Sequence, residues 1–266
     1  AMLKASARSL AMLYYLDNVT NTKSGPNENY ARELMELHTL GVGGGFSETD
    51  VKQVARCFTG WTVTGSSSNN PVFTFSSSQH DTAAKNVLGN TIAAGGGISD
   101  GDRVLDILAA HPSTARYIAE KLCIRFIGDH PQTTAIDQVA ATYIATSGNI
   151  SSMLLTLFGS AEFLASYDRK IRRPVEYIVG ALRVLEPSLA GDYLTRISSR
   201  LTTLGQMPFK WPTPDGYSDE MADWVNTGAS LTRWNWVFGL AEDKISTSIR
   251  INISSLIGTA NTPRLL

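Results

Sequence analysis

The residues of this chain that are best suited to chemistry are carboxylates and histidines in two short stretches. Glu33 and Glu36 stand three residues apart in a helix-forming stretch, and His80 and Asp81 are adjacent in a polar one. Two carboxylates in different surroundings can act as general acid and as base or nucleophile in glycoside hydrolysis. A neighbouring histidine can orient a group or shuttle a proton. The candidate catalytic residues are Glu33, Glu36, Asp81 and His80.

Glu33 is the carboxylate whose position most needs an explanation. At about 100° per residue, it projects into the middle of an apolar helix face. The apolar residues of that face are Tyr30, Leu34, Leu37 and Leu40. A buried carboxylate is costly unless it is paired or hydrogen-bonded, and burial raises its pKa. We therefore expect Glu33 to be buried, either as a general acid or as a structural acid satisfied by arginine or backbone donors.

Further residues could hold a substrate: Trp61, Trp211, Arg32, His38 and Lys85. The two tryptophans offer flat surfaces for a sugar ring, and Lys85 could pair with Glu33 or Asp81. Structural alternatives stay open for each of them. Trp61 could belong to the core, His38 could be structural, and Asp81 could cap a helix. Arg32 has the i,i+4 spacing of a surface ion pair.

The elements that must position these residues are mostly helical. Apolar periodicity and turn residues predict helices at about 4–16, 27–42, 47–59, 101–110, 112–128, 133–147, 150–165, 172–185, 190–204 and 227–245. Ser47 and Asp50 form a capping-box pattern at the start of one of them. Alternating apolar residues around a Gly/Ser/Asn turn predict one small β-hairpin at about 61–76. We expect an irregular loop at about 76–99, a second loop at 205–220, and a single mainly helical domain over 1–266.

Composition excludes some functions. The net charge of −1 lacks the basic excess of a general nucleic-acid binder, and no apolar run is long enough to span a membrane. Cys57 and Cys123 lie among apolar neighbours, which favours buried free thiols over a disulfide. Neither cysteine belongs to a zinc motif, so no cofactor is expected. No signal peptide is visible in the sequence, and Ala1 before Met2 is typical of a tag remnant. The compartment, and whether the protein is exported, therefore stay open.

The chain resembles a known bacterial family. Its signature is similar to Asn27-Glu-Asn-Tyr-Ala-Arg-Glu-Leu34 through Leu37-His-Thr-Leu-Gly41, followed by Phe58-Thr-Gly-Trp61. Further matching stretches are His80-Asp81 with Lys85 and Leu88-Gly89, His111 to Ala115 with Lys121-Leu122, Lys170 with Pro174-Val-Glu176, and Pro208 to Tyr217. The family is the domain of unknown function number eighteen hundred. Gly43 and Ala83 depart from its pattern, which commonly has Asp and Gly there.

The resemblance implies a mainly helical, soluble bacterial protein and covers essentially the whole chain. It places weight on Glu33, Glu36, His38, His80 and Asp81 without giving them roles. Typical members carry a further N-terminal half, so this chain resembles their C-terminal half. A surface that this half normally covers could then self-associate.

Three functions remain open at this point. The favoured one is a hydrolase that acts on a saccharide or other small molecule, with glycosidic bonds before esters because no serine stands in a nucleophile motif. A non-enzymatic binding or scaffold domain is the first alternative. A metal-dependent enzyme is the second, because Glu33, His38, His80 and Asp81 supply suitable ligand types for a divalent metal.

Overall fold

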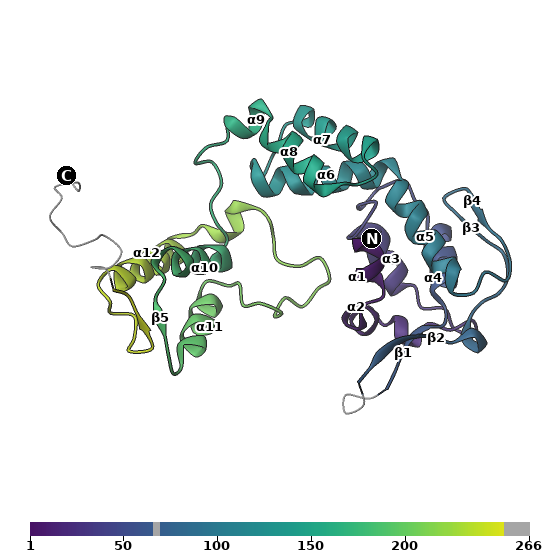
Figure 1. Ribbon diagram of the computed structural model, residues 1–266, viewed down its shortest axis with the longest axis horizontal. Helices are drawn as coiled ribbons and strands as arrows, with labels where there is room; N and C mark the ends of the chain where they lie inside the picture. Colours follow the sequence, from purple (N-terminus) through teal and green to yellow (C-terminus); the bar gives the residue numbers. More distant parts are fainter. Residues whose placement is uncertain (66–69, 253–266) are drawn as a thin grey trace. The chain divides into compact units, whose positions relative to one another are not determined.

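The computed structural model describes residues 1–65 and 70–252. Within them the protein is mainly helical, as predicted, with twelve α-helices and three two-stranded antiparallel sheets (Figure 1). The chain packs as two compact units. Unit 1 holds residues 1–126 and 130–165, and unit 2 holds residues 127–129 and the chain from residue 166 onward. The single domain stays a prediction, because packing alone does not show whether two units fold independently.

Unit 1 begins with two short helices where the sequence predicts one. Helix α1 (Met2–Ala7) and helix α2 (Leu10–Tyr15) are separated at Ser9, whose hydroxyl accepts a hydrogen bond from the backbone N–H of Met12 at 3.3 Å. A serine hydroxyl in this position satisfies one of the free N–H groups of a new helix. A 3-10 turn, η1 (Asn18–Thr20), follows.

Helix α3 (Asn29–Glu36) is shorter than the predicted helix at 27–42. Its buried residues are Tyr30, Ala31, Leu34 and Met35. Because the helix ends at Glu36, residues 37–40 do not continue its helical face. Helix α4 (Glu48–Phe58) starts with the predicted capping box, since Ser47 and Asp50 exchange hydrogen bonds between side chain and backbone.

The predicted hairpin is confirmed. Strand β1 (Trp61–Thr64) pairs with strand β2 (Val72–Phe75), and part of its turn, residues 66–69, lies outside the described residues. The irregular loop predicted at 76–99 is wrong in part, because it holds the 3-10 turn η2 (Ser77–Gln79) and a second hairpin. Strand β3 (Lys85–Val87) pairs there with β4 (Asn90–Ile92). This second hairpin forms because Leu88 and Gly89 make a two-residue turn, and both have the positive φ that a tight hairpin turn requires.

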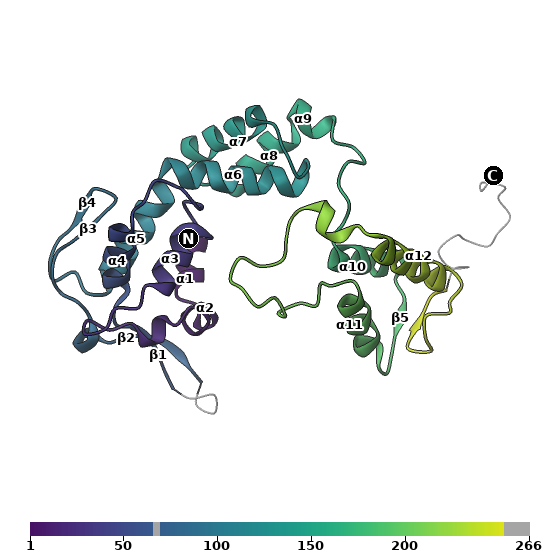
Figure 2. The ribbon, with the colours of Figure 1, turned by 180° about the vertical axis from the view of Figure 1, so that it is seen from behind.

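Five further helices complete unit 1: α5 (Ile98–Ala110), α6 (Pro112–Phe126), α7 (Thr133–Ala145), α8 (Ile150–Phe158) and α9 (Ala161–Leu164). Helices α6, α7 and α8 lie side by side, as both ribbon views show (Figure 2). Pro112 occupies the first position of α6, where its missing N–H costs nothing. The predicted helix at 150–165 is interrupted at Gly159, and Ser160 caps the next helix.

The core of unit 1 contains a chain of aromatic rings. The ring centroids of Tyr30 and Phe58 are 5.1 Å apart, those of Phe58 and Trp61 5.0 Å, and those of Trp61 and Phe73 5.2 Å, all edge to face. Burying one such side chain contributes about 2 kcal/mol. Helix α5 meets Trp61 at Gly101, where a Cβ atom would lie 2.4 Å from the indole ring. These contacts fix the first hairpin against α4 and α5.

The described part of unit 2 holds three α-helices, a 3-10 turn and one small sheet. Helices α10 (Pro174–Leu185), α11 (Tyr193–Thr203) and α12 (Thr227–Ala241) contribute to its apolar core. Strand β5 (Ser188–Leu189) pairs with β6 (Ile249–Arg250). Residues 205–220 form the predicted loop, which leads into the 3-10 turn η3 (Met221–Trp224). In the described part of both units, no helix is long and apolar enough to cross a bilayer.

Candidate functional site

The predicted catalytic residue His80 belongs to a buried polar network with Lys85 and Asp100. The three residues are only 1%, 3% and 1% exposed. His80 Nε2 lies 3.2 Å from Oδ2 of Asp100, and Lys85 Nζ donates to the same oxygen at 2.6 Å. The other ring nitrogen of His80, Nδ1, lies 2.8 Å from the carbonyl oxygen of Thr59. Each charged member of this buried network therefore already has a partner inside the protein.

Asp81 is held by helix α4. Arg56 Nε donates to Oδ2 of Asp81 at 2.7 Å, Arg56 Nη2 donates to Oδ1 at 3.3 Å, and the backbone N–H of Ala83 donates to Oδ1 at 2.9 Å. The hydrogen bond from Arg56 is the main cause that lowers the pKa of Asp81. A carboxylate held in this way stabilises the loop and is a poor proton donor at neutral pH.

The predicted pairing of Lys85 with Glu33 or with the carboxylate of Asp81 is wrong. Its ammonium group pairs with Asp100 and donates a second hydrogen bond to the backbone carbonyl of Asp81. Lys85 therefore cannot also hold a substrate in this arrangement. Trp61 is fully buried between Phe58 and Phe73, so it belongs to the core and offers no surface to a sugar.

The predicted burial of Glu33 is wrong, because its side chain is half-buried. The four buried residues of α3 centre on a direction about 130° away from Glu33 around the helix axis, at 100° per residue. The expected apolar face extended the helix through Leu40, but the helix ends at Glu36. Glu33 therefore lies beside the buried face instead of within it.

Arg32 forms the surface ion pairs expected from its spacing. Its guanidinium lies 3.7 Å from Glu28 and 3.6 Å from Glu36, and it makes a two-pronged contact with Glu48 at 2.8 and 2.7 Å. Three carboxylates around one arginine join α3 to the start of α4. This arrangement accounts for Arg32 as a structural residue.

Glu36 lines an open cleft of about 510 Å³ in unit 1. The cleft lies between the end of α3, the glycine-rich turn that follows it, and one side of α6. The residues that line it, here called the Glu36 cleft, are Glu36, Leu37, Leu40, Gly41, Val42, Gly43, Gly44, Ser113, Arg116, Tyr117, Glu120, Lys121 and Ile124. Two of the stretches that resemble the family signature, 27–41 and 111–122, thus meet at one surface.

Two contacts shape the Glu36 cleft. The Tyr117 hydroxyl donates to the carbonyl oxygen of Leu37 at 3.1 Å, and Gly41 turns the chain with a φ of +85° directly against the Tyr117 ring. Glu120 is the second carboxylate that lines this cleft. Glu120 was not among the predicted site residues. The one signal in the sequence is its place beside Lys121, which belongs to one of the matching stretches.

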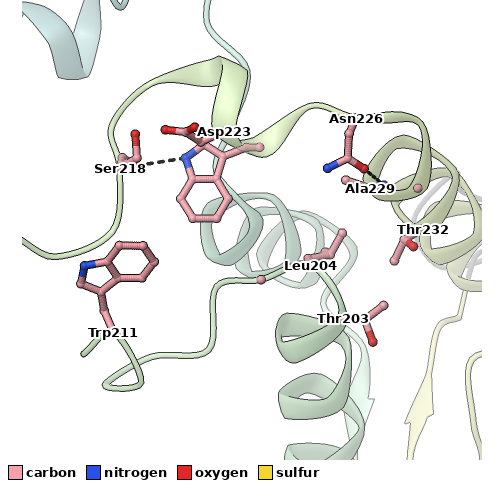
Figure 3. Close-up of a pocket in the computed structure, with 11 residues that line it drawn as sticks. Thr203, Leu204, Trp211, Ser218, Asp223, Asn226, Ala229 and Thr232 are labelled. Carbon is pink, nitrogen blue, oxygen red and sulfur yellow. Dashed lines mark hydrogen bonds between the residues drawn. The ribbon is translucent and has the colours of Figure 1, made fainter. Parts of the chain in front are cut away.

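Trp211 lines a pocket of about 670 Å³ in unit 2. The pocket lies between the 205–220 loop, η3, and the adjoining ends of α11 and α12. Figure 3 shows Trp211, Asp223, Asn226 and Thr232 around its open centre. Here called the Trp211 pocket, it is lined by Thr203, Leu204, Gly205, Trp211, Ser218, Asp223, Trp224, Asn226, Gly228, Ala229 and Thr232.

Trp211 is 42% exposed, and two contacts hold the orientation of its indole ring. Its Nε1 donates to Oδ1 of Asp215 at 3.0 Å, and its ring centroid lies 4.9 Å from that of Tyr217. The Tyr217 hydroxyl donates to the carbonyl of Met207 at 2.7 Å. A ring held in this way can bind a ligand with little loss of side-chain freedom.

The predicted site residues therefore occupy separate places. Glu36 lines one cleft, His38 lines a second pocket in unit 1, and Trp211 lies in unit 2. His80, Asp81 and Lys85 belong to the networks that hold α4, β3 and α5 together. Across residues 1–65 and 70–252, no group of three His, Cys, Asp or Glu side chains is placed to hold a metal ion. Glu33, His38, His80 and Asp81 thus form no common ligand set.

Comparison with known proteins places the chain in a family. A family model described as Protein of unknown function (DUF1800) matches residues 1–265. No curated protein and no solved structure matches the chain. The match extends over both units, which agrees with the resemblance found in the sequence. The chain therefore belongs to the DUF1800 family.

Proposed function

We propose that this protein binds a carbohydrate, with one sugar ring lying against the indole of Trp211. The observation that carries the proposal is the exposed, pre-oriented face of Trp211 at the edge of a pocket with several polar side chains. Ligand pockets of roughly 300–1,000 Å³ with a few placed polar groups are typical binding sites for small molecules. An aromatic ring beside hydroxyl, amide and carboxylate groups suits a sugar, which has both C–H and O–H surfaces.

The polar groups of the pocket can take further hydrogen bonds. The carboxylate of Asp223 and the hydroxyl of Thr232 make no hydrogen bond to another residue that the structure describes. The carbonyl oxygen of the Asn226 side chain accepts from the N–H of Ala229 at 2.8 Å, which leaves its NH₂ group to donate. An acceptor, a hydroxyl and a donor thus line the same pocket as the ring, which suits the hydroxyl groups of a sugar.

Binding fits this pocket better than hydrolysis does. Glycoside hydrolysis normally uses two carboxyl groups on opposite sides of the scissile bond. Asp223 is the one carboxylate among the lining residues that the structure describes. The proposed role is therefore recognition of a saccharide by unit 2.

The proposal is tested by titrating purified protein with a panel of oligosaccharides and measuring binding by calorimetry. We expect Trp211→Ala to weaken binding at least tenfold, about 1.4 kcal/mol. Trp234→Ala is the matched control, because Trp234 is an exposed tryptophan of the same unit on α12 that does not line the pocket. The proposal fails if no saccharide binds, or if the two substitutions have equal effects.

Hydrolysis at the Glu36 cleft is the second candidate function. It is favoured by the presence of two carboxylates, Glu36 from α3 and Glu120 from α6, among the residues that line one cleft. One would protonate the leaving oxygen and the other would activate water or attack the sugar. Activity on a panel of glycosides should then fall at least a hundredfold in both Glu36→Gln and Glu120→Gln. Glu242→Gln, on the surface of unit 2, should match the wild type. Wild-type rates no higher than the blank would remove this candidate.

A further inference from the structure

A second pocket in unit 1 has a different chemical character. It has a volume of about 480 Å³ and lies between α1, α3, the start of α6 and the chain from Tyr143 to Ile150. Much of its wall is apolar, with Ala7, Met12, Leu34, Ile118 and Ile150 among the lining residues. No Asp, Glu, Lys or Arg side chain in the described part of the chain lines it. Apart from the amino group of Ala1, the described wall therefore offers an ionised ligand no group of opposite charge.

The aromatic and threonine hydroxyls of this pocket have already given their hydrogen to the protein. Each donates to a backbone carbonyl, at distances between 2.6 and 2.8 Å. The pairs are Tyr30 to Ala7, Thr39 to Leu34, Thr114 to Leu108, and Tyr143 to Ala109. The two serines of the pocket, Ser6 and Ser147, are exposed at its rim. The inner wall thus offers few free donors to a ligand.

His38 is the polar residue of the wall that remains available. It follows α3, its side chain is half-buried, and its imidazole makes no hydrogen bond to any residue among those described. Burial lowers the pKa of His38, so the ring is neutral at neutral pH. A neutral imidazole has one N–H donor and one nitrogen acceptor. It can therefore pair with a hydroxyl group that both donates and accepts.

We propose that this pocket binds an uncharged, mainly apolar small molecule with a single hydroxyl group, such as an alkylphenol, and that His38 forms the hydrogen bond to that hydroxyl. The apolar wall buries the body of the ligand, and its volume falls within the range of small-molecule sites. His38 makes the pocket prefer a ligand with a hydroxyl group over one without it, because a ligand without a hydroxyl leaves the imidazole desolvated and unpaired. This site shares no lining residue with the Trp211 pocket, so it does not depend on the proposed carbohydrate binding.

The test compares 4-butylphenol with butylbenzene, which differs only in lacking the hydroxyl. Calorimetric titration should show saturable binding of 4-butylphenol, with butylbenzene at least tenfold weaker. In His38→Leu the two compounds should bind with equal affinity. His130→Leu is the matched control, because His130 is an exposed histidine of unit 1 that does not line the pocket. It should keep the wild-type preference.

If His38→Leu does not fold, NMR of the wild-type protein tests the same contact. The ring ¹⁵N signals of His38 should shift on addition of 4-butylphenol, and those of His130 should not. The proposal is overturned if neither compound binds saturably, if the preference for the phenol persists in His38→Leu, or if the His38 signals stay unchanged at saturation.

Discussion

Lys85 Nζ lies 2.6 Å from Oδ2 of Asp100, and both side chains are withdrawn from solvent. Removing one partner of a buried ion pair leaves a desolvated charge, which typically costs about 3–5 kcal/mol. We expect Asp100→Asn to lower the free energy of unfolding by that amount, measured by urea denaturation. Lys85→Met/Asp100→Asn should cost less than the sum of the two single changes.

Lys244→Met provides the surface comparison for this pair. Lys244 pairs with Glu242 at 3.0 Å, and both side chains are largely exposed. A pair of this kind contributes about 0–1 kcal/mol. If Asp100→Asn were no more costly than Lys244→Met, the buried network would have no role in holding the hairpin against α5.

Gly41 should be far less tolerant of substitution than Gly43, two residues further on. Both have positive φ, at +85° and +75°, where an added side chain costs about 1–2 kcal/mol. A Cβ at Gly41 would also lie 2.7 Å from the Tyr117 ring, whereas a Cβ at Gly43 would meet nothing within 4 Å. The Tyr117 ring is held by its hydrogen bond to Leu37 and cannot easily move aside. Thermal unfolding of Gly41→Ala and Gly43→Ala should show a clearly lower Tm for the first. Equal Tm values would contradict this packing.

The two cysteines should be unreactive in the folded protein. Burial raises the pKa of Cys57 to about 12 and that of Cys123 to about 11, and the thiolate is the reactive form. A thiol reagent at pH 8 should therefore label neither residue in native protein and both in 6 M guanidinium. Rapid labelling of native protein at one site would show that its helix opens.

The same raised pKa values predict a loss of stability in alkali. Above about pH 9 the thiols ionise in the unfolded chain but keep their protons in the folded one, so the unfolded state binds fewer protons. The free energy of unfolding should therefore fall as the pH rises from about 9 towards 12. Cys57→Ala should reduce this slope, which urea denaturation at several pH values would measure. If the free energy of unfolding of Cys57→Ala fell with pH as steeply as that of the wild type, groups other than Cys57 would cause the loss of stability in alkali.

The orientation of Trp211 should depend on Asp215. Hydrogen bonds from Thr213 and from the Trp211 indole lower the pKa of this carboxyl, so it stays ionised somewhat below the usual range of an aspartate. If the Trp211 pocket binds a saccharide, Asp215→Asn should weaken that affinity a few-fold, less than Trp211→Ala, with an unchanged Tm. Wild-type affinity should hold between pH 7 and 5 and fall only when Asp215 is protonated. If the saccharide affinity of Asp215→Asn fell as steeply with decreasing pH as that of the wild type, a group other than Asp215 would cause the pH dependence.

Local patterns predicted much of the secondary structure. The capping box at Ser47 and Asp50, the proline at the start of α6, and the alternation in β1 and β2 each act over a few residues, and each is confirmed. The second hairpin was missed because its strands are three residues long and its turn includes Leu88 at positive φ. Leu88 tolerates that conformation where Asp50, far away in the sequence, accepts its N–H at 2.8 Å.

The candidate sites were harder to predict, because they depend on pairs that are distant in the sequence. Asp100 completes the network of His80 and Lys85 from helix α5, and no local pattern marks it as their partner. Glu33 was placed on a buried face because the helical period was continued through Leu40, beyond the actual end of α3 at Glu36. Asp223 lines the same pocket as Trp211 although the two residues come from different segments, η3 and the preceding loop.

The contact between Trp61 and Gly101 links the allowed sizes of two positions that are 40 residues apart in the sequence. Because the indole ring occupies the place of a side chain on α5, any residue larger than glycine at 101 requires a smaller ring at 61. Contacts of this kind make two positions vary together among related sequences. Family members with alanine or serine at the place of Gly101 should therefore have phenylalanine or a smaller residue at the place of Trp61, and the pair offers a test of whether a distant relative keeps the same hairpin register.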